Sequence, residues 1–532
     1  MQLPLKKALA DSLAAFSMGT LLACALTACG GSGGDANTIA TDKGVVTGKE
    51  TAGYRQFLGI PYAAAPTGAL RWQPPQPAAA WSGARDATRF APHCAQLAAQ
   101  PAGPYGTAST AEDCLYLNVY TPKTGKGPFP VMFWIHGGSL MNGEGDDYDP
   151  TALVGQGVAV VTINYRLGAL GFLTHPALSA EQGGASGNYG LMDQQAALQW
   201  VKANIKAFGG DPNNVTVFGE SAGGLSVHGQ LVSPLAAGLF HKAIIESGAY
   251  NLNPPTLAQA EARGQTFAAS AGCADQSIAC LRALPVGDVL ANTTKINPAG
   301  STLPTVDGKV LPASYAQAFA SGNFNKMPII EGTNQHEYSL QSATSIDLAL
   351  GREMNADEYQ TMVRTQFGAA ASNILALYPV TRTPAWAYDS LATDVGFSCN
   401  GRKIAQLVAA QGQPVYAYEF ADANAPVVFD LPARVDGYGA YHASELQYLW
   451  PTQPLKIYYG APFTAAQTDL SNKMVAYWAQ FAKTGNPNVA GSPAWPAYTQ
   501  AGDTYLTLAP GAIAPSTTFG AEHQCAVWTP AG

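Results

Sequence analysis

Long apolar runs alternate with segments of helical periodicity along this chain. Residues 131–135 and 158–163 are almost entirely apolar, as expected for central strands of a sheet that is covered on both faces. Apolar residues recur at helical spacing within 191–208, Gly and Pro at 209–212 end that helix, and 215–218 begins another strand. This alternation predicts an α/β fold with a mostly parallel sheet and right-handed crossovers. Further strands are predicted at residues 243–246, 328–331, 415–420 and 504–508.

The composition is that of a globular protein with a large core. Of 532 residues, 47% are hydrophobic and 12% are charged, whereas a disordered chain would be less hydrophobic and more charged. The net charge is −8 and the only basic cluster is Lys6-Lys7, so nucleic acid is not expected as a partner. After residue 30 no run reaches about eighteen apolar residues, so the body of the chain is not expected to span a membrane.

The first thirty residues have the pattern of an export signal. Lys6 and Lys7 precede an apolar run at 13–28, which is typical of a secretory signal peptide. The run ends in Leu-Thr-Ala-Cys29 and is followed by glycine-rich residues 30–34, which resembles the bacterial lipoprotein box with Cys29 as the lipidated residue. Cys24 lies in a second match that lacks a flexible spacer. An ordinary signal peptide is the alternative, and both interpretations predict an exported protein.

Export makes the remaining cysteines informative, because six of them would lie in an oxidising compartment. Six cysteines allow many pairings, but proximity in the sequence favours two short bridges and leaves one long bridge by exclusion. The resulting pairs are Cys94–Cys114, Cys273–Cys280 and Cys399–Cys525. The cysteines are scattered and none forms a Cys-x-x-Cys beside histidines, so no metal site is expected.

A sharp turn follows the strand at 215–218. Residues 219–223 read Gly-x-Ser-x-Gly, the pattern of a nucleophile elbow that lifts the hydroxyl of Ser221 above the edge of a sheet. The N–H of Ala222 would then lie at a helix N-terminus, directed at a developing oxyanion. A glycine-rich turn is the alternative, but the position between a strand and the apolar residues 225–227 favours the elbow.

A second glycine-rich segment follows the strand at 131–135. Residues 136–140 read His-Gly-Gly-Ser-Leu, which fits the loop that contributes further N–H donors to an oxyanion hole. Gly138 and Ser139 are the donors expected here, because a backbone without a bulky side chain can approach a tetrahedral intermediate closely. Two parts of one oxyanion hole on separate strands favour a serine hydrolase over two unrelated turns.

Together these segments resemble the type-B carboxylesterase family, which includes cholinesterases, liver-type carboxylesterases and large fungal lipases. The resemblance covers roughly residues 38–528. It implies an α/β-hydrolase fold, with helices on both faces of the sheet and large insertions, and a carboxylic-ester hydrolase acting on small-molecule esters. With the export signal it implies a signal peptide at 1–29, a flexible tether at 30–37 and one catalytic domain at 38–532. Further motifs that match the family lie at residues 57–63, 112–119, 164–168 and 193–201.

The same resemblance assigns structural roles to cysteines and charges. The disulfides of the family map onto the three pairs reached above. Two ion pairs, Arg71–Glu112 and Arg166–Asp193, correspond to structural ion pairs of the family, so a catalytic role is not expected for these four residues.

A serine nucleophile needs a base that takes its proton and an acid that orients the base. Among eight histidines, His442 lies in Gly-x-x-His-x-x-Glu-Leu at 439–446, which resembles the catalytic-histidine loop of the family. The order nucleophile, acid, histidine along an α/β-hydrolase chain also places His442 last. We therefore expect His442 to be the base.

The expected acid is Glu337, in the segment Gly-Thr-Asn-Gln-His-Glu-Tyr at 332–338. The family usually has Gly-Thr-Asn-x-Asp-Glu-Gly there, so His336 and Tyr338 depart from it beside the acid. Both neighbours line the site in relatives, and the departures put the shape of the pocket in question. The alternative for Glu337 is a solvated loop carboxylate. The other acids that could serve are Glu331 and Asp347.

This machinery calls for no cofactor and no metal. Glu220 and Ser226 resemble residues that surround the triad in relatives, and packing is the alternative role for both. Residues 95–113 contain no tryptophan, and Tyr105 is their only aromatic residue, so a choline ester is not expected. Leu140 stands where relatives commonly have Phe, which predicts a wider acyl pocket.

Three alternatives concern the activity itself. The same machinery could act on aromatic-acid or polyester substrates, or as an amidase or lactonase, because all of these share the triad chemistry. A non-catalytic adhesion relative is disfavoured, because Ser221, His442 and the Gly-Gly pair are present. We expect a periplasmic or outer-membrane-anchored lipoprotein, or otherwise a secreted enzyme, which contacts a membrane only through the N-terminal lipid.

Overall fold

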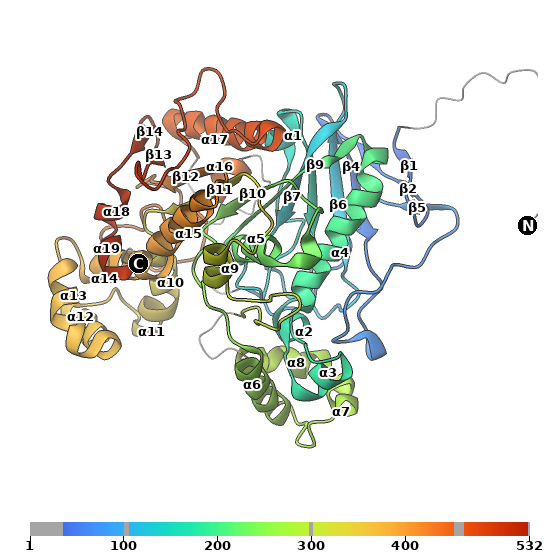
Figure 1. Cartoon of the computed structure of the whole chain (residues 1–532), viewed down its shortest axis with the longest axis horizontal. Helices are drawn as coiled ribbons and strands as arrows, with labels where there is room; N and C mark the ends of the chain where they lie inside the picture. Colours follow the sequence, from blue (N-terminus) through green and yellow to red (C-terminus); the bar gives the residue numbers. More distant parts are fainter. Residues whose placement is uncertain (1–35, 100–105, 297–301, 452–461, 530–532) are drawn as a thin grey trace, which may run out of the picture. The chain divides into compact units, whose positions relative to one another are not determined.

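The apolar runs form the middle of a large sheet in the computed structural model, which describes residues 36–99, 106–296, 302–451 and 462–529 (Figure 1). Within these residues the sheet has eleven strands in the order β14-β13-β12-β11-β10-β9-β7-β8-β6-β4-β3. They are β3 (Lys49–Glu50), β4 (Tyr54–Pro61), β6 (Tyr116–Pro122), β7 (Phe129–Ile135), β8 (Ala159–Ile163), β9 (Gly210–Glu220), β10 (Lys242–Glu246), β11 (Ile329–Asn334), β12 (Val415–Phe420), β13 (Tyr505–Leu508) and β14 (Ala514–Ser516).

The predicted mostly parallel sheet is confirmed. Strands β8, β7 and β9 to β13 pair in parallel, whereas β6, β4 and β3 at one edge and β14 at the other pair antiparallel. A small separate sheet contains β1 (Thr38–Ala40), β2 (Val45–Thr47) and β5 (Ala84–Asp86). The signal peptide, Cys29, the glycine-rich segment and Tyr105 lie outside the described residues.

Strand β7 shows why the sheet is buried on both sides. Val131, Phe133 and Ile135 belong to one hydrophobic cluster, whereas Met132 and Trp134 belong to another. Successive side chains of a strand point to opposite faces, so a continuous apolar run supplies both clusters. Helices α4, α5, α9 and α15 contribute to the first cluster, and α1, α16 and α17 contribute to the second.

Two predicted boundaries were wrong in detail. The helix predicted at 191–208 is α4 (Tyr189–Asn204) followed by a 3-10 turn, η2 (Ile205–Phe208), which ends at Gly209 with φ of 91°. Strand β9 begins at Gly210 rather than at residue 215, because Gly210 pairs with Phe129 before the register shifts. Gly and Pro therefore end the helix as predicted, but the chain enters the sheet at once.

The helices lie between and beyond these strands. They are α1 (Thr151–Gly155), α2 (Gly168–Phe172), α3 (Pro176–Glu181), α5 (Ala222–Val232), α6 (Leu257–Ser270), α7 (Ile278–Ala283), α8 (Val286–Ala291), α9 (Tyr315–Ser321), α10 (Tyr338–Ser342), α11 (Leu348–Leu350), α12 (Ala356–Phe367), α13 (Ala371–Leu377), α14 (Pro384–Thr393), α15 (Cys399–Ala410), α16 (Leu446–Leu449), α17 (Ala465–Thr484), α18 (Phe519–Glu522) and α19 (Cys525–Trp528). The short 3-10 and π turns are η1 (Gly68–Leu70), η3 (Pro234–Ala236), η4 (Thr293–Ile296), η5 (Ala343–Asp347), η6 (Gly368–Ala370) and η7 (Asp394–Ser398).

Residues 338–398, from α10 to η7, form a region that we call the helical region. It has a hydrophobic cluster of its own, which includes Tyr359, Val363, Ile374 and Leu391. In Figure 1 its helices α12 and α13 lie away from the central strands, in yellow and orange. It is one of the helical insertions that the family resemblance predicts.

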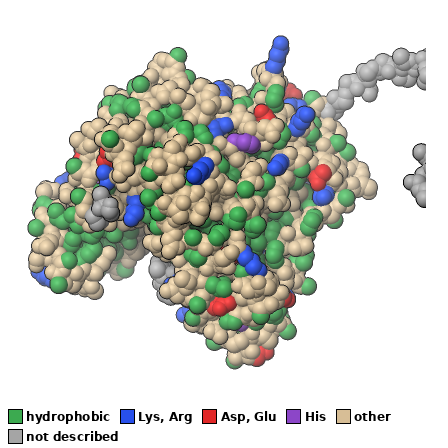
Figure 2. Space-filling model, in the orientation of Figure 1, with side chains coloured by type: hydrophobic (Ala, Val, Ile, Leu, Met, Phe, Trp, Pro, Cys, Tyr) green, Lys and Arg blue, Asp and Glu red, His purple; other side chains and the backbone are tan. Residues whose placement is uncertain are grey.

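The six cysteines are joined in the three expected pairs, Cys94–Cys114, Cys273–Cys280 and Cys399–Cys525. On the face shown in Figure 2, charged side chains are scattered singly among polar and apolar ones. Within the described ranges, no helix combines the length and the apolar character needed to cross a membrane.

Candidate active site

Ser221 lies at the tip of a sharp turn between β9 and α5. Its φ of 55° and ψ of −120° are unusual for a residue with a side chain, so the turn is strained. Its N–H donates to the carbonyl of Glu246 on β10 at 2.8 Å, which fixes the turn above the sheet. A Cβ on Gly223 would lie 2.0 Å from the carbonyl oxygen of Ile135, so glycine is required where α5 passes β7. The predicted elbow is therefore formed.

Three residues that are far apart in the sequence meet at this turn. Nε2 of His442 lies 2.7 Å from Oγ of Ser221, across 221 positions of the chain. Nδ1 of His442 lies 2.6 Å from Oε2 of Glu337, across 105 positions. The three side chains thus form one continuous line of hydrogen bonds, in the order that a nucleophile, base and acid require.

Glu337 is held firmly in this position. Its Oε1 accepts a hydrogen bond from the Thr333 hydroxyl at 2.8 Å and another from the Asn334 N–H at 2.7 Å. The side chain is fully buried, which contradicts the alternative of a solvated loop carboxylate. The two other acids are bound elsewhere, because Glu331 pairs with His228 at 3.0 Å and Asp347 pairs with Arg434 at 2.7 Å.

The loop after β7 lies against the elbow. A Cβ on Gly137 would come within 3.2 Å of Cβ of Ser221 and 2.9 Å of the carbonyl oxygen of Glu220. Gly138, Ser139 and Leu140 then follow with φ of 96°, 58° and 56°, a run of left-handed conformations that turns the backbone sharply. This brings the two expected parts of the oxyanion hole, the loop and the start of α5, together beside the serine.

Glu220 lies closest to the triad among the other acids. Its Oε1 is 3.3 Å from Nε2 of His442, and the side chain is buried. Burial raises the pKa of Glu220 well above its usual value, and the nearby carboxylates of Glu337 and Glu246 raise it further. These surroundings favour the uncharged form of Glu220, which places no second negative charge against the imidazole.

Two further buried acids, Glu246 and Glu445, were not singled out from the sequence. Burial raises the pKa of Glu246 to about 8, although Nε1 of Trp478 donates to its Oε1 at 2.7 Å. Burial likewise raises the pKa of Glu445 well above normal, with Glu220 as the next cause. Glu246 could have been noticed in the sequence, because it is a glutamate at the end of the apolar strand 242–246.

Ser226 does not contact the triad directly. It is fully buried on α5, and its hydroxyl accepts a hydrogen bond from Nε2 of Gln194 on α4 at 3.1 Å. Oε1 of Gln194 in turn accepts from Gln230 at 2.9 Å. Ser226 therefore joins two helices behind the nucleophile, which agrees with the packing alternative.

His336 and Tyr338, which depart from the family pattern, are packed into the surrounding structure. Nδ1 of His336 accepts a hydrogen bond from the Ala440 N–H at 3.3 Å, and its ring lies 4.3 Å from that of Trp386. Burial lowers the pKa of His336 to about 3, so the ring is neutral. Tyr338 packs edge-on against Tyr388 at 5.9 Å, in the cluster of the helical region.

One aromatic contact of the base was missed from the sequence. The ring of Phe397, in η7, lies 5.2 Å from that of His442. No sequence motif marks Phe397, because its position depends on how the helical region packs. Leu140 is fully buried in the core cluster rather than at the surface of the turn.

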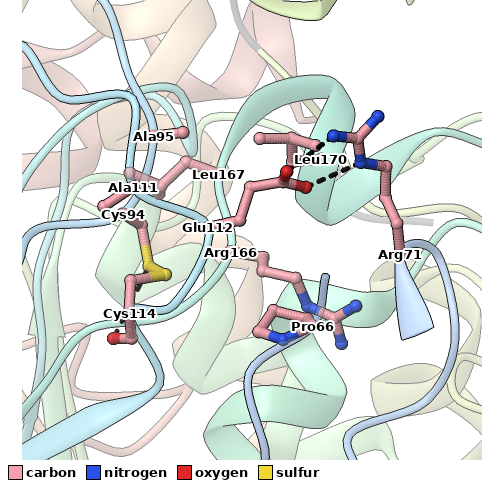
Figure 3. A pocket seen from close by; sticks show the side chains of 10 residues that line it. All are labelled: Pro66, Arg71, Cys94, Ala95, Ala111, Glu112, Cys114, Arg166, Leu167 and Leu170. Carbon is pink, nitrogen blue, oxygen red and sulfur yellow. Dashed lines mark hydrogen bonds and ion pairs between the residues drawn. A yellow bond between two sulfur atoms is a disulfide. The ribbon is translucent and has the colours of Figure 1, made fainter. Parts of the chain in front are cut away.

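The charges expected to be structural form ion pairs away from the triad. Arg71 binds Glu112 through two hydrogen bonds of 2.7 and 2.6 Å, beside the disulfide of Cys94 and a small cavity (Figure 3). Arg166 binds the carboxylate of Asp193 through two hydrogen bonds of 2.8 and 2.7 Å. In the part of the chain that the structure describes, no group of three or more metal-ligating side chains is placed to hold a metal ion.

Residues 35–528 match the model of the carboxylesterase family. The chain belongs to the carboxylesterase family. This carboxylesterase is 37% identical to the fumonisin B1 esterase of Sphingopyxis macrogoltabida, over 87% of this chain and 85% of that protein. It is 35% identical to carboxylesterase 1C of Rattus norvegicus, over 92% of both. Among solved structures, a thermophilic PNB esterase superposes with a TM-score of 0.79 and 32% identity, and covers 92% of this chain and 100% of its own.

These similarities establish the activity at the level of the family. The fold is that of the α/β-hydrolases, and the protein is a serine hydrolase that cleaves carboxylic esters. The type-B carboxylesterase resemblance of the sequence is thereby confirmed.

Proposed function

We propose that this carboxylesterase cleaves small-molecule esters through an acyl-enzyme formed on Ser221, with His442 as the base and Glu337 as the orienting acid. The observation that carries the proposal is the unbroken line of hydrogen bonds from Glu337 through His442 to Ser221. Each ring nitrogen of His442 has one partner in that line, which fixes the tautomer that can accept a proton from the serine.

The chemistry follows from that arrangement. Nε2 of His442 takes the hydroxyl proton while Oγ of Ser221 attacks the ester carbonyl, and a tetrahedral oxyanion forms. The N–H groups of Gly138, Ser139 and Ala222 would donate to that oxyanion, and one such donor is worth roughly 3 kcal/mol in related enzymes. His442 then returns the proton to the leaving alcohol. Water, activated by the same nitrogen, releases the acid from Ser221 in the second half-reaction.

The uncharged state of Glu220 supports the same proposal. A carboxylate 3.3 Å from Nε2 would hold the imidazole in its protonated form, and a protonated imidazole cannot act as a base. Because burial favours the protonated form of Glu220, the carboxylate assigned to His442 in this proposal is Glu337, on the opposite ring nitrogen. Glu337 is thus placed to stabilise the positive charge that His442 gains when it takes the serine proton.

Covalent labelling tests the nucleophile directly. A fluorophosphonate should add one equivalent to the wild-type enzyme, and peptide mass spectrometry should place the adduct on Ser221. The Ser221→Ala variant should take up no label and should lose activity, while its circular dichroism stays native because alanine fits the turn. Labelling of a different serine with full loss of activity would refute the assignment.

The substrate class needs a panel of esters. The expected substrates are small esters, and the alternatives are aromatic-acid esters, polyesters, amides and lactones. One relative is named for fumonisin B1, so a multiply esterified substrate belongs in the panel. Comparison of a p-nitrophenyl ester with the matching anilide separates an esterase from an amidase, and choline esters should be poor substrates.

We propose further that the enzyme is exported and held at a membrane through a lipid on Cys29. Lys6-Lys7, the apolar run 13–28 and the glycine-rich segment 30–34 support this, as do three disulfides, which persist in oxidising compartments. Position 30 is Gly rather than Asp, which favours the outer membrane over the inner one. Cys29→Ser should move active enzyme from the membrane to the soluble fraction. A wild-type enzyme that is already soluble, with a mature N-terminus beyond Cys29, would leave ordinary secretion as the explanation.

A further inference from the structure

A cavity separate from the triad opens beside the antiparallel edge of the sheet. Its volume is about 480 Å³, within the range of roughly 300–1,000 Å³ that is typical of sites for small molecules. Strands β3, β4 and β6 form one side, and residues 88–93 and 144–150 form the others. None of the residues that line it belongs to the triad or to the oxyanion loop.

Aromatic rings form much of its wall. Tyr54 and Tyr120 meet edge to face, with ring centroids 5.8 Å apart. The ring of Tyr148 is fixed from behind by Trp134 at 4.9 Å. Phe90 also lines the cavity, and 46% of its surface is exposed, which is unusual for a large apolar side chain. The cavity therefore offers ring faces and edges that packing holds in place.

Four carboxylates also line the cavity. They are Glu144, Asp146, Asp147 and Asp149, which all come from the segment between β7 and α1. Glu144 is 1% exposed and accepts the Thr107 N–H at 2.9 Å, and Asp146 lies 3.0 Å from Nε2 of His93. Asp149 uses Oδ1 to accept from the N–H and hydroxyl of Thr151, at 2.9 and 2.5 Å, which leaves Oδ2 for another donor.

Three basic residues, Lys49, Arg89 and His93, line the cavity together with the four carboxylates, and His93 lies 3.5 Å from Glu144 and 3.0 Å from Asp146. Lys49 and Arg89 are exposed. Both also interact with Asp86, a residue that does not line the cavity. The pKa of Asp86 is lowered first by hydrogen bonds from Thr88 and then by the charges of Arg89 and Lys49. The wall itself therefore carries an excess of negative charge.

The pKa shifts of two tyrosines that line the cavity reflect the same negative charge. The pKa of Tyr54 is raised, first by burial and then by the carboxylate of Asp149. The pKa of Tyr120 is raised well above normal by burial, with further contributions from Tyr54, Asp146 and Asp149. Negative charge thus faces the aromatic rings across the cavity.

We propose that this cavity binds a small organic cation, in which an ammonium group is joined to an apolar or aromatic body. The ammonium group would lie against the carboxylates and the faces of the tyrosines, and the apolar body would cover Phe90. A metal ion fits less well, because no three ligating side chains converge among the described residues. The volume also exceeds what an ion needs.

Three probes that differ only in the head group test the charge. They are 2-phenylethylammonium, 2-phenylethanol and 3-phenylpropanoate, titrated by calorimetry into enzyme whose active-site serine has been blocked with a fluorophosphonate. We expect the ammonium ion to bind at least about tenfold more tightly than the alcohol, and the carboxylate not to bind. Equal binding of the ammonium ion and the alcohol would overturn the proposal. Loss of binding upon blocking would also overturn it, because the ligand would then lie in the active site.

Substitutions of single aspartates test whether the ligand lies in this cavity. Asp149→Asn keeps the acceptor for Thr151 but removes the charge, and should weaken binding of 2-phenylethylammonium about fivefold or more. Asp275→Asn is the control, because Asp275 also accepts from the residue two positions later, from the Ser277 N–H on Oδ1 at 3.2 Å and from its hydroxyl on Oδ2 at 2.9 Å, and does not line the cavity. Equal affinities of these two variants would overturn the proposal.

A second pair of variants tests the ring. Tyr54→Leu should weaken binding several-fold, whereas Tyr54→Phe, which keeps the ring face, should bind as the wild type does. Thermal midpoints within a few degrees of the wild type show that all variants are folded. The same affinity for the leucine and phenylalanine variants would refute a contact between the cation and the ring.

Discussion

The catalytic centre and the helical region beside it use buried polar groups in opposite ways. Around the triad, Glu220, Glu246 and Glu445 are buried acids whose pKa is raised by burial, to about 8 for Glu246, so burial favours their uncharged forms. His136, in the oxyanion loop, is also neutral, because burial lowers its pKa to about 4. Here burial favours uncharged polar groups around the proposed base, and Glu337 lies 2.6 Å from Nδ1 of His442.

The helical region is instead held by buried charges. Arg434 lies 2.7 Å from Asp347 and 2.5 Å from Asp389. A second network surrounds His523, which lies 2.7 Å from Glu419 and also bonds Asp394 in η7.

The pKa of His523 is raised to about 10 by its two carboxylate partners, even though burial alone would lower it, so its ring is charged.

The difference follows from what each region does. A base that must change its charge during the reaction works best where neighbouring charges are few and fixed. In the helical region, Asp347, Asp389 and Asp394 pair with Arg434 and His523 from later segments, and such pairs help to specify how segments pack. Substitutions in the triad should therefore lower activity, whereas substitutions in the buried ion pairs should lower stability.

The largest effect should come from the triad. His442→Ala should lower kcat on p-nitrophenyl acetate about a million-fold, and Glu337→Gln about ten-thousand-fold, because the acid orients the base but does not exchange the proton. His336→Ala is the control and should lose far less. If His336→Ala were the more damaging of the two histidine variants, the base would have been misassigned.

Removal of the charge at His523 should instead lower stability. His523→Gln leaves Asp394 and Glu419 buried without a cation, and should reduce the free energy of unfolding by about 3 kcal/mol. Arg402→Gln, which breaks the more exposed pair with Asp503, should cost about 0.5–1 kcal/mol. Chemical denaturation measures both, and kcat of the folded variants should stay within tenfold of the wild type. Equal losses in the two variants would contradict the special role of the buried network.

The two regions should also respond to pH with opposite sign. His523 keeps a proton up to about pH 10 that the unfolded chain loses near 6.5, so its stabilisation is lost as pH rises between these values. His136 stays neutral in the folded protein down to about pH 4, whereas in the unfolded chain it takes up a proton near pH 6.5. The stability of the folded state therefore falls as pH decreases from about 6.5 towards about 4. Each should change stability by about 1.4 kcal/mol per pH unit within its range.

Denaturation curves at pH 5, 7 and 9 would separate these contributions. His523→Gln should flatten the alkaline side of the stability profile, and His136→Gln should flatten the acid side. A profile that kept its alkaline slope in the His523 variant would show that another group titrates there.

The smallest effect should come from Glu220. Because its carboxyl group is already protonated, Glu220→Gln replaces an uncharged group by another of the same shape. At neutral pH kcat/KM should therefore change by less than about tenfold. A loss of a hundredfold or more would show that Glu220 acts as a carboxylate.

Local features were the most predictable from the sequence. Apolar runs predicted β7 and β8, and glycine spacing predicted the turn at Ser221, because a few adjacent residues determine each of them. The antiparallel strands β4 and β6 were not predicted as strands, since their pairing depends on distant partners. The family resemblance, rather than periodicity, indicated His442 and Glu337.

The hydrogen bonds and the burial around the site residues could not be predicted from the sequence. The bonds from Thr333 and Asn334 to Glu337 need the exact path of the chain after β11. The burial that makes Glu220 and Glu246 uncharged depends on helices and strands from distant parts of the sequence. The sequence left the effect of His336 on the pocket open, and no motif marks the hydrogen bond that its ring accepts from the Ala440 backbone, a contact between two loops.

The position of His523 has a consequence for synthesis. A ribosome makes Asp394 and Glu419 more than one hundred residues before it makes their shared cation, as the 129 and 104 positions between them show. Until that part of the chain emerges, the two carboxylates lack the cation that both bind in the finished protein. The contacts that join η7, β12 and the segment after α18 can therefore form only after nearly the whole polypeptide has been made.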